Sequence, residues 1–155
     1  MSAVVVSPRL QMRDMLIHDI SQVVEIERTI YEFPWRQQIF QDCFHANHIC
    51  KVYELGLELL GYGIASVGAS ECHILNVCIH PEVQRHGLGT GLLHSVIQEC
   101  QRRAVGMIFL EVRASNFEAQ ALYTKIGFNQ VGIRSGYYPA TKGREDALVL
   151  AKDLS

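Results

Sequence analysis

The chain has 155 residues, of which 48% are hydrophobic and 19% are charged, and its formal net charge is −2. This length and composition are typical of one globular domain over 1–155, and they exclude a disordered or fibrous chain. The small net charge provides no strong attraction for nucleic acid. No apolar run reaches the ~18–20 residues that a membrane helix needs. We expect a cytoplasmic monomer that binds neither nucleic acid nor membrane.

The amino-terminal residues and the cysteines support the same expectation. Met1 to Pro8 contains neither a basic segment nor a long apolar one, so it does not form a signal peptide. The cysteines form no C-x-x-C pair, and we expect reduced thiols that pack as small hydrophobic side chains. Cys43, His45, His48 and Cys50 are close in sequence, but their spacings match no zinc motif. We predict no metal site.

The amino-terminal third of the chain predicts one strand followed by two helices. Residues 10–16 alternate apolar and polar side chains, as a half-buried strand does. Asp19 or Ser21 can cap the helix that follows. The apolar side of this helix consists of Ile20, Val23, Val24 and Ile30. A break at Pro34 separates it from a second, short helix over 37–44.

The remaining elements alternate between strands and helices. Apolar residues recur at helical spacing over 87–103, which makes this the clearest helix of the chain. A second helix is expected over 116–126, ended by Gly127. Strands are expected over 49–55, 57–67, 72–79, 107–112, 128–133 and 147–151. This order predicts an α/β domain with a mixed central sheet of about seven strands flanked by about four helices.

A glycine-rich loop joins the strand over 72–79 to the long helix. Its sequence is Gln84-Arg85-His86-Gly87-Leu88-Gly89. The start of a helix leaves backbone N–H groups unpaired, glycines let these amides approach an anion closely, and Arg85 can add a charged contact. The loop therefore predicts a pyrophosphate site. Gly87, Gly89 and the following Gly91 give a G-x-G-x-G spacing. This spacing fits neither the P-loop nor the Rossmann fingerprint, and a turn that merely starts a helix is the alternative.

The motif Gln84-Arg85-x-Gly87-x-Gly89 resembles the acetyl-CoA-binding motif of the GCN5-related N-acetyltransferase (GNAT) superfamily. The resemblance implies the GNAT fold and acetyl-CoA as cosubstrate. It also implies that a bulged strand contacts the pantetheine arm and the thioester of the cofactor. The implied cofactor-binding residues are Val77, Cys78, Ile79, Arg85, His86, Gly87, Leu88, Gly89, Thr90 and Asn116.

Later blocks of sequence resemble the RimI branch of this superfamily, the ribosomal-protein-alanine N-acetyltransferases. These blocks are Phe33-Pro34-Trp35 and the segments 110–116, 121–123, 127–128, 137–139 and 143–147. The resemblance implies direct transfer of acetyl to a protein N-terminus, namely the N-terminal alanine of small-subunit ribosomal protein eighteen. An enzyme that acetylates a small amine, and an idle acyl-CoA-binding module, are the alternatives.

Glu111 and Tyr123 are the candidate catalytic residues. By strand alternation Glu111 shares a face with apolar residues, a position suited to a general base, although a solvent-exposed glutamate at a strand end is the alternative. Tyr123 can be a core tyrosine or an acid. The resemblance makes Glu111 the proton acceptor and Tyr123 the proton donor to the CoA thiolate. Cys78 has no activating neighbour in sequence, so we expect no acyl-enzyme.

Four further residues are placed around this chemistry. Asn116 precedes Tyr123 by two helical turns, which puts both on one helix face about 10 Å apart. The resemblance makes Asn116 a CoA contact, and a helix cap is its other possible role. Trp35, Tyr137 and Tyr138 are expected to shape the acceptor slot, or otherwise to pack a turn against the sheet.

Overall fold

The computed structural model describes residues 10–80 and 87–155. The helices and strands in chain order are β1 (Leu10–Asp14), the 3-10 turn η1 (Ile17–Asp19), α1 (Ile20–Ile30), α2 (Gln37–His45), β2 (Ile49–Leu55), β3 (Glu58–Gly68), β4 (Glu71–Ile79), α3 (Leu88–Arg102), β5 (Met107–Arg113), α4 (Phe117–Ile126), β6 (Asn129–Pro139) and β7 (Arg144–Asp153). Within the described residues, seven strands form one sheet in the order β1-β2-β3-β4-β5-β7-β6. The predicted α/β class, with a mixed sheet and four α-helices, is confirmed.

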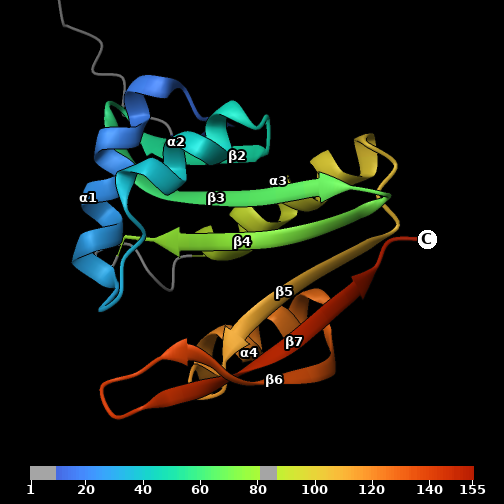
Figure 1. Ribbon diagram of the computed structural model, residues 1–155. Coiled ribbons are helices and arrows are strands. Elements are labelled where there is room, and N and C mark those ends of the chain that lie inside the picture. Colours follow the sequence, from blue (N-terminus) through green and yellow to red (C-terminus); the bar gives the residue numbers. More distant parts are fainter. Residues whose placement is uncertain (1–9, 81–86) are drawn as a thin grey trace, which may run out of the picture.

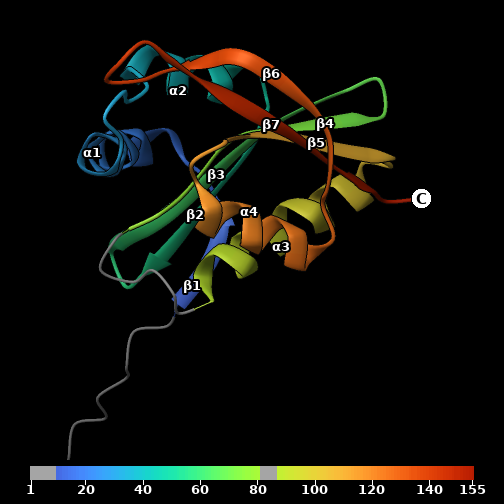
Figure 2. The same ribbon diagram turned by 90° about the horizontal axis from the view of Figure 1, so that it is seen from below.

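The helices cover the two faces of the sheet in pairs (Figures 1 and 2). α1 and α2 pack on one face, where Phe40 and Tyr62 are fully buried and their rings meet edge to face at 5.7 Å. α3 and α4 pack on the other face, where Leu93 and Ile108 are fully buried. α1, α2 and α3 thus bury an apolar stripe, and α4 packs partly buried apolar side chains on the same core as α3; this burial is the main source of helix stability.

Two predicted boundaries were wrong for reasons visible in the backbone. β1 ends at Asp14 rather than at residue 16, because the chain turns into η1. The carboxylate of Asp19 accepts from the amide of Leu16 at 2.7 Å, so it caps this turn and not α1. β6 continues from Asn129 to Pro139 instead of ending at residue 133. A register shift accommodates the turn-like Gly136, whose φ is +60°.

The central feature of the sheet is the separation of its two parallel strands. β4 and β5 pair from Glu71 with Met107 to Ile74 with Leu110, and beyond this point they diverge (Figure 1). The register of β4 against β3 shifts at the same place, because Ile74 and Asn76 face consecutive residues of β3. Leu75 is therefore the extra residue of a β-bulge, located at the fork of the sheet.

The bulge changes which side of the sheet the end of β4 presents. Cys72 and Ile74 point into the core beneath α3, as alternation requires. Cys78 would follow them to that side in a regular strand, but it lies in the core beneath α1 and α2. One inserted residue thus reverses the alternation for the rest of the strand.

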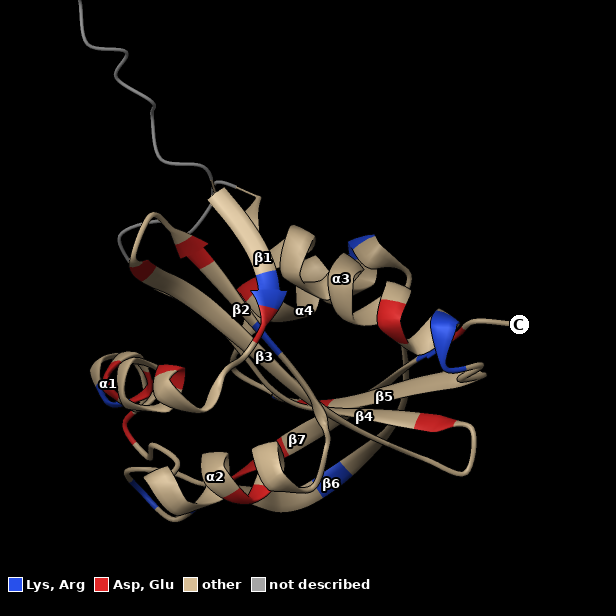
Figure 3. Cartoon of the chain, turned by 90° about the horizontal axis from the view of Figure 1, so that it is seen from above, with Lys and Arg blue, Asp and Glu red and all other residues tan. Residues whose placement is uncertain are grey.

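Charged residues are interspersed over the described helices and strands (Figure 3). Arg13 illustrates the pattern, since it pairs with Asp19 at 2.7 Å and with Glu54 at 3.1 Å. Within residues 10–80 and 87–155, no helix combines the length and the apolar character required to cross a bilayer.

Gly91 explains the third glycine of the sequence motif by packing rather than by ligand binding. It lies in the second turn of α3 beside Tyr53 of β2. A Cβ atom at this position would overlap with the Tyr53 hydroxyl, whereas the nearest ring atom would remain at 3.4 Å. The absence of a side chain at Gly91 therefore allows β2 and α3 to approach each other.

This contact predicts a coupling between the two residues. In the wild-type background, Gly91→Ala should be neutral or destabilising, because the helix-propensity gain of ~0.5–1 kcal/mol is offset by an overpacking cost of ~1–3 kcal/mol. In a Tyr53→Phe background the same substitution should stabilise the protein. Urea titrations of the four variants should give a coupling free energy of ~1–2 kcal/mol. Additive effects would contradict the packing explanation.

Candidate active site

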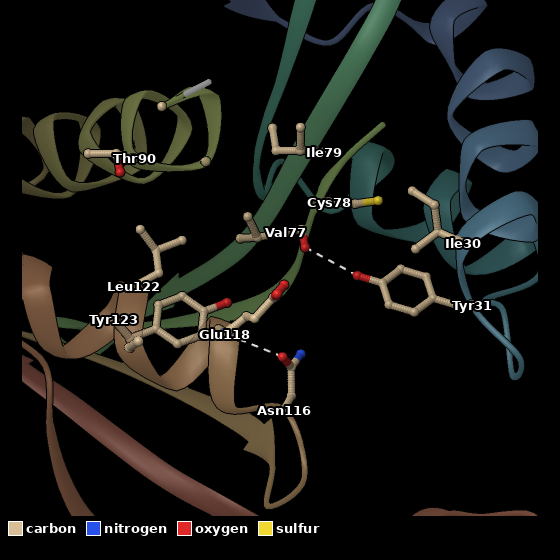
Figure 4. Close-up of a pocket in the computed structure, with 14 residues that line it drawn as sticks. Ile30, Tyr31, Val77, Cys78, Ile79, Thr90, Asn116, Glu118, Leu122 and Tyr123 are labelled. Carbon is tan, nitrogen blue, oxygen red and sulfur yellow. Dashed lines mark hydrogen bonds between the residues drawn. The ribbon is translucent and has the colours of Figure 1, made fainter. Parts of the chain in front are cut away.

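A cavity of about 580 Å³ opens where β4 and β5 separate, a volume typical of small-molecule sites. It is bounded by the end of α1, the last residues of β4, the start of α3 and residues of α4 (Figure 4). Its lining consists of Ile30, Tyr31, Val77, Cys78, Ile79, Gly87, Gly89, Thr90, Asn116, Glu118, Ala119, Ala121, Leu122 and Tyr123. Most of the predicted cofactor residues are therefore brought together in one place.

The start of α3 forms one end of this cavity. Gly87 is the residue before the helix and has φ +76°, a backbone angle that glycine adopts without strain. The first hydrogen bond of the helix runs from the amide of Gly91 to the carbonyl of Gly87 at 3.1 Å. The amides of Leu88, Gly89 and Thr90 precede it, and the positive end of the helix dipole lies with them. Gln84, Arg85 and His86 lie outside the described residues.

The wall formed by β4 presents main-chain groups and a buried thiol. Val77, Cys78 and Ile79 follow the bulge at Leu75, on the stretch of β4 that has separated from β5. The hydroxyl of Tyr31 donates to the carbonyl of Val77 at 3.2 Å (Figure 4). Burial raises the pKa of the Cys78 thiol to about 12, so it is protonated at neutral pH. A protonated thiol is a poor nucleophile, consistent with the expectation that no acyl-enzyme forms.

α4 contributes Asn116 and Tyr123 to the same cavity, as their spacing predicted. Asn116 is also the N-cap of α4, because its side-chain oxygen accepts from the amide of Ala119 at 3.2 Å. The ring of Tyr123 packs edge to face against Phe128 at 5.8 Å, and its hydroxyl points into the cavity (Figure 4). Burial raises the pKa of Tyr123 to about 12, so the phenol carries its proton at neutral pH.

Glu111 lies on β5, beside this cavity rather than in its lining. Its side chain is 11% exposed, and its Oε1 atom lies 3.4 Å from the Nε atom of Arg134 on β6. Tyr138 connects this group to Tyr123: burial raises the pKa of Tyr138, and the neighbouring Tyr137, Glu111 and Tyr123 add to the effect. Both candidate catalytic residues therefore lie within electrostatic reach of one phenol.

The predicted acceptor residues lie on two separate segments. Tyr137 and Tyr138 of β6 meet edge to face at 4.9 Å. Trp35 lies in the α1–α2 loop and packs on Phe40 at 5.2 Å. The same loop reaches the β6–β7 turn, where the hydroxyl of Thr141 donates to a Glu32 carboxylate oxygen at 3.0 Å. This hydrogen bond joins the two segments.

Several residues of the site had no role assigned from sequence. Arg113 lies 4.5 Å from the centre of the Tyr138 ring and pairs with Glu145 at 3.0 Å, so it holds the loop end of the β6–β7 hairpin. Both residues belong to sequence blocks that supported the resemblance, which was the available signal. Tyr31 offered no such signal, because its partner is the main-chain carbonyl of Val77.

The segment rich in cysteine and histidine forms part of the α1–α2 side of the protein. Cys43 and Cys50 are buried, and all five cysteines of the chain are free. His45 is exposed at the end of α2. In the part of the chain that the structure describes, no three His, Cys, Asp or Glu side chains are arranged to hold a metal ion.

Comparison with known proteins agrees with this fold. A model of the acetyltransferase (GNAT) family matches residues 17–128. The chain is 36% identical over 137 residues to ribosomal protein bS18-alanine N-acetyltransferase of Escherichia coli K12, covering 88% of this chain and 93% of that protein. It is 35% identical to the putative enzyme of the same name from Bacillus subtilis over 89% of this chain and 91% of that protein. The chain belongs to the acetyltransferase (GNAT) family.

The structural comparison extends over almost the whole molecule. The crystal structure of the ribosomal-protein-S18-alanine N-acetyltransferase from Escherichia coli superposes with a TM-score of 0.90 at 34% identity, covering 95% of each chain. The structure of Ard1 from Thermoplasma volcanium, at 23% identity and a TM-score of 0.86, covers 94% of this chain and 98% of that one and shares the fold. The separated parallel strands thus belong to a fold that recurs at low sequence identity.

The state of the Cys78 thiol yields a prediction that needs no ligand. Because its pKa is about 12, iodoacetamide should modify Cys78 at pH 8 roughly a thousandfold more slowly in the folded protein than in urea. Peptide mass mapping over a time course measures both rates. Similar rates in the two conditions would contradict a buried, protonated thiol.

Proposed function

We propose that this chain transfers the acetyl group of acetyl-CoA to the α-amino group of a protein, with the N-terminal alanine of ribosomal protein bS18 as the acceptor. One observation carries the proposal: the fork between β4 and β5 opens a cavity that extends from the unpaired amides of α3 to the hydroxyl of Tyr123. An elongated cofactor with an anionic end and a reactive end fits such a site.

The lining of the cavity suits the parts of acetyl-CoA in order. The amides at the start of α3, with Gly87 and Gly89, suit the diphosphate. The separated edge of β4 at Val77, Cys78 and Ile79 suits the amide-bearing arm, as a sheet edge suits an added strand. On the α4 wall, Asn116 suits a contact with the cofactor and Tyr123 suits a position beside the sulfur. We assign Leu88 and Thr90 to the diphosphate end and leave Arg85 and His86 as sequence-based candidates.

Acetyl transfer requires proton transfer at the attacking nitrogen and at the leaving sulfur. Glu111 accepts a proton from the acceptor ammonium, directly or through one water, and the free amine attacks the thioester carbonyl. The new C–N bond forms as the C–S bond breaks, and Tyr123 donates its phenolic proton to the leaving sulfur. The second proton lost by the nitrogen passes through solvent and restores the phenol of Tyr123, while the proton on Glu111 is released to solvent. A pKa of about 12 keeps Tyr123 in the protonated form that this role needs. Arg134 holds the carboxylate of Glu111 in place.

The choice of acceptor is supported by the relatives and by the aromatic walls. The Escherichia coli relative, at 36% identity over most of both chains, is named for the alanine terminus of ribosomal protein bS18. Tyr137 and Tyr138 lie beside Glu111, and Trp35 lies on the loop that Glu32 joins to the β6–β7 turn. We propose that these three aromatic residues bind the first residues of the acceptor peptide.

Incubation with acetyl-CoA and a short peptide beginning Ala-Arg-Tyr tests the function. We expect a mass increase of one acetyl group at the peptide amino terminus, and we expect Glu111→Gln to slow this turnover by roughly 10²–10⁴-fold because it removes the base. The same peptide with a blocked amino terminus is the control. Acetylation of a small amine but of no peptide would favour a different acceptor, and no acetylation of any amine would indicate an idle binding module.

The assignment of Tyr123 as the acid gives a second prediction. Tyr123→Phe removes one hydroxyl and keeps the ring that packs on Phe128. We expect kcat to fall by at least roughly tenfold while the Kd for acetyl-CoA, measured by calorimetry, changes less than about twofold. Equal losses in both quantities would assign Tyr123 to cofactor binding instead.

A further inference from the structure

Glu27 is a buried carboxylate on the apolar side of α1. It occupies the helical position that follows Val23 and Val24 by one turn and precedes Ile30. The residue is only 2% exposed, and it lies in the core that α1 and α2 form against the sheet. A carboxylate is rarely buried to this extent unless hydrogen bonds compensate for its lost hydration.

Three donors from three different elements meet this carboxylate. Its Oε1 atom accepts from the hydroxyl of Tyr62 on β3 at 2.5 Å and from the side-chain amide of Asn76 on β4 at 2.8 Å. Its Oε2 atom accepts from the main-chain amide of Trp35 at 2.8 Å. One side chain therefore joins α1 to the sheet and to the α1–α2 loop.

Two of these partners adjoin the proposed active site. Asn76 is the first residue of β4 beyond the bulge at Leu75, directly before Val77 in the cavity wall. Trp35 belongs to the segment proposed to bind the acceptor. The hydrogen bonds from Trp35 and Asn76 end on the same carboxylate, so the position of the α1–α2 loop is tied to the end of β4 that follows the bulge.

We propose that Glu27 is a positioning residue for the acceptor peptide. Resting on the function proposed above, Glu27 fixes the main chain at Trp35 relative to the strand that forms the cofactor wall, so that the acceptor amine enters at the right place. Glu27 touches neither substrate. Its loss should therefore impair binding of the peptide more than binding of acetyl-CoA.

Exchanging the two side chains that share a hydrogen bond provides the sharpest test. Glu27→Gln has only one oxygen for three donors, and Asn76→Asp places a second carboxylate beside Glu27. The double variant Glu27→Gln/Asn76→Asp keeps one buried carboxylate: the glutamine oxygen accepts from Trp35, its amide donates to Asp, and the Tyr62 hydroxyl can rotate. Glu25→Gln, on the exposed side of the same helix, is the matched control.

We expect each single variant to raise the KM for the peptide roughly tenfold to a hundredfold, as the loss of a charge-assisted hydrogen bond implies. The Kd for acetyl-CoA should stay within about twofold of wild type, and the double variant should recover a KM within about threefold of wild type. Equal losses for both substrates, or no recovery in the double variant, would overturn the proposal. Should the single variants fail to fold, Tyr62→Phe replaces them and should raise the KM selectively by a smaller factor.

Trp35 provides a second readout that needs no substrate, because it is the only tryptophan of the chain. Acrylamide quenching of its fluorescence should increase in the single variants, or in Tyr62→Phe, and return to the wild-type value in the double variant and in the control. Unchanged quenching in folded single variants would overturn the proposal. If the wild-type protein acetylates no peptide, the proposed function is wrong, and the quenching series alone decides whether Glu27 holds this loop.

Discussion

The parting of β4 from β5 after four paired residues is the constraint on which the site depends. Two parallel strands that stay paired satisfy each other's main-chain groups and leave no room between them. Here the bulge at Leu75 diverts β4 toward α1, and the carbonyl of Val77 then accepts from the Tyr31 side chain instead of from a neighbouring strand. The fork thus creates a cavity and a hydrogen-bonding wall at once.

The fork also determines why the proposed proton acceptor and donor come from different elements. Glu111 follows the last pair of the β4–β5 ladder, so it lies where β5 first leaves β4. Tyr123 lies on α4, which packs on the face of the sheet opposite to the one that Glu111 occupies. Placing the two groups on separate supports lets each have its own environment: an ion pair with Arg134 for the carboxylate, and apolar burial for the phenol.

Periodicity in the sequence predicted nearly every element, because most of the helices and the central strands turn an apolar side toward the core. It did not predict the bulge, since Val77-Cys78-Ile79 reads as continuous apolar strand in either register. The extension of β6 was missed for a related reason: Gly136 signals a turn, whereas the sheet absorbs it in a register shift. The glycine motif located the cavity, and spacing placed Asn116 and Tyr123 in it together. Contacts to main-chain atoms, such as the hydrogen bond from the Tyr31 hydroxyl to the carbonyl of Val77, cannot be recognised from residue types.

Glu27, on the apolar side of α1, is a signal that the sequence already contains. A helix whose apolar side contains a glutamate either exposes that residue at a cost or buries it among donors. Glu27 is buried among donors. Three of them, rather than a single partner, compensate for its lost hydration. Replacing such a group with an apolar side chain often costs little stability in itself, so stability is a weak reason for its presence. Its three partners lie on β3, on β4 directly after the bulge, and in the α1–α2 loop. The stronger reason for Glu27 is therefore the precise placement of this loop against the sheet, as proposed above.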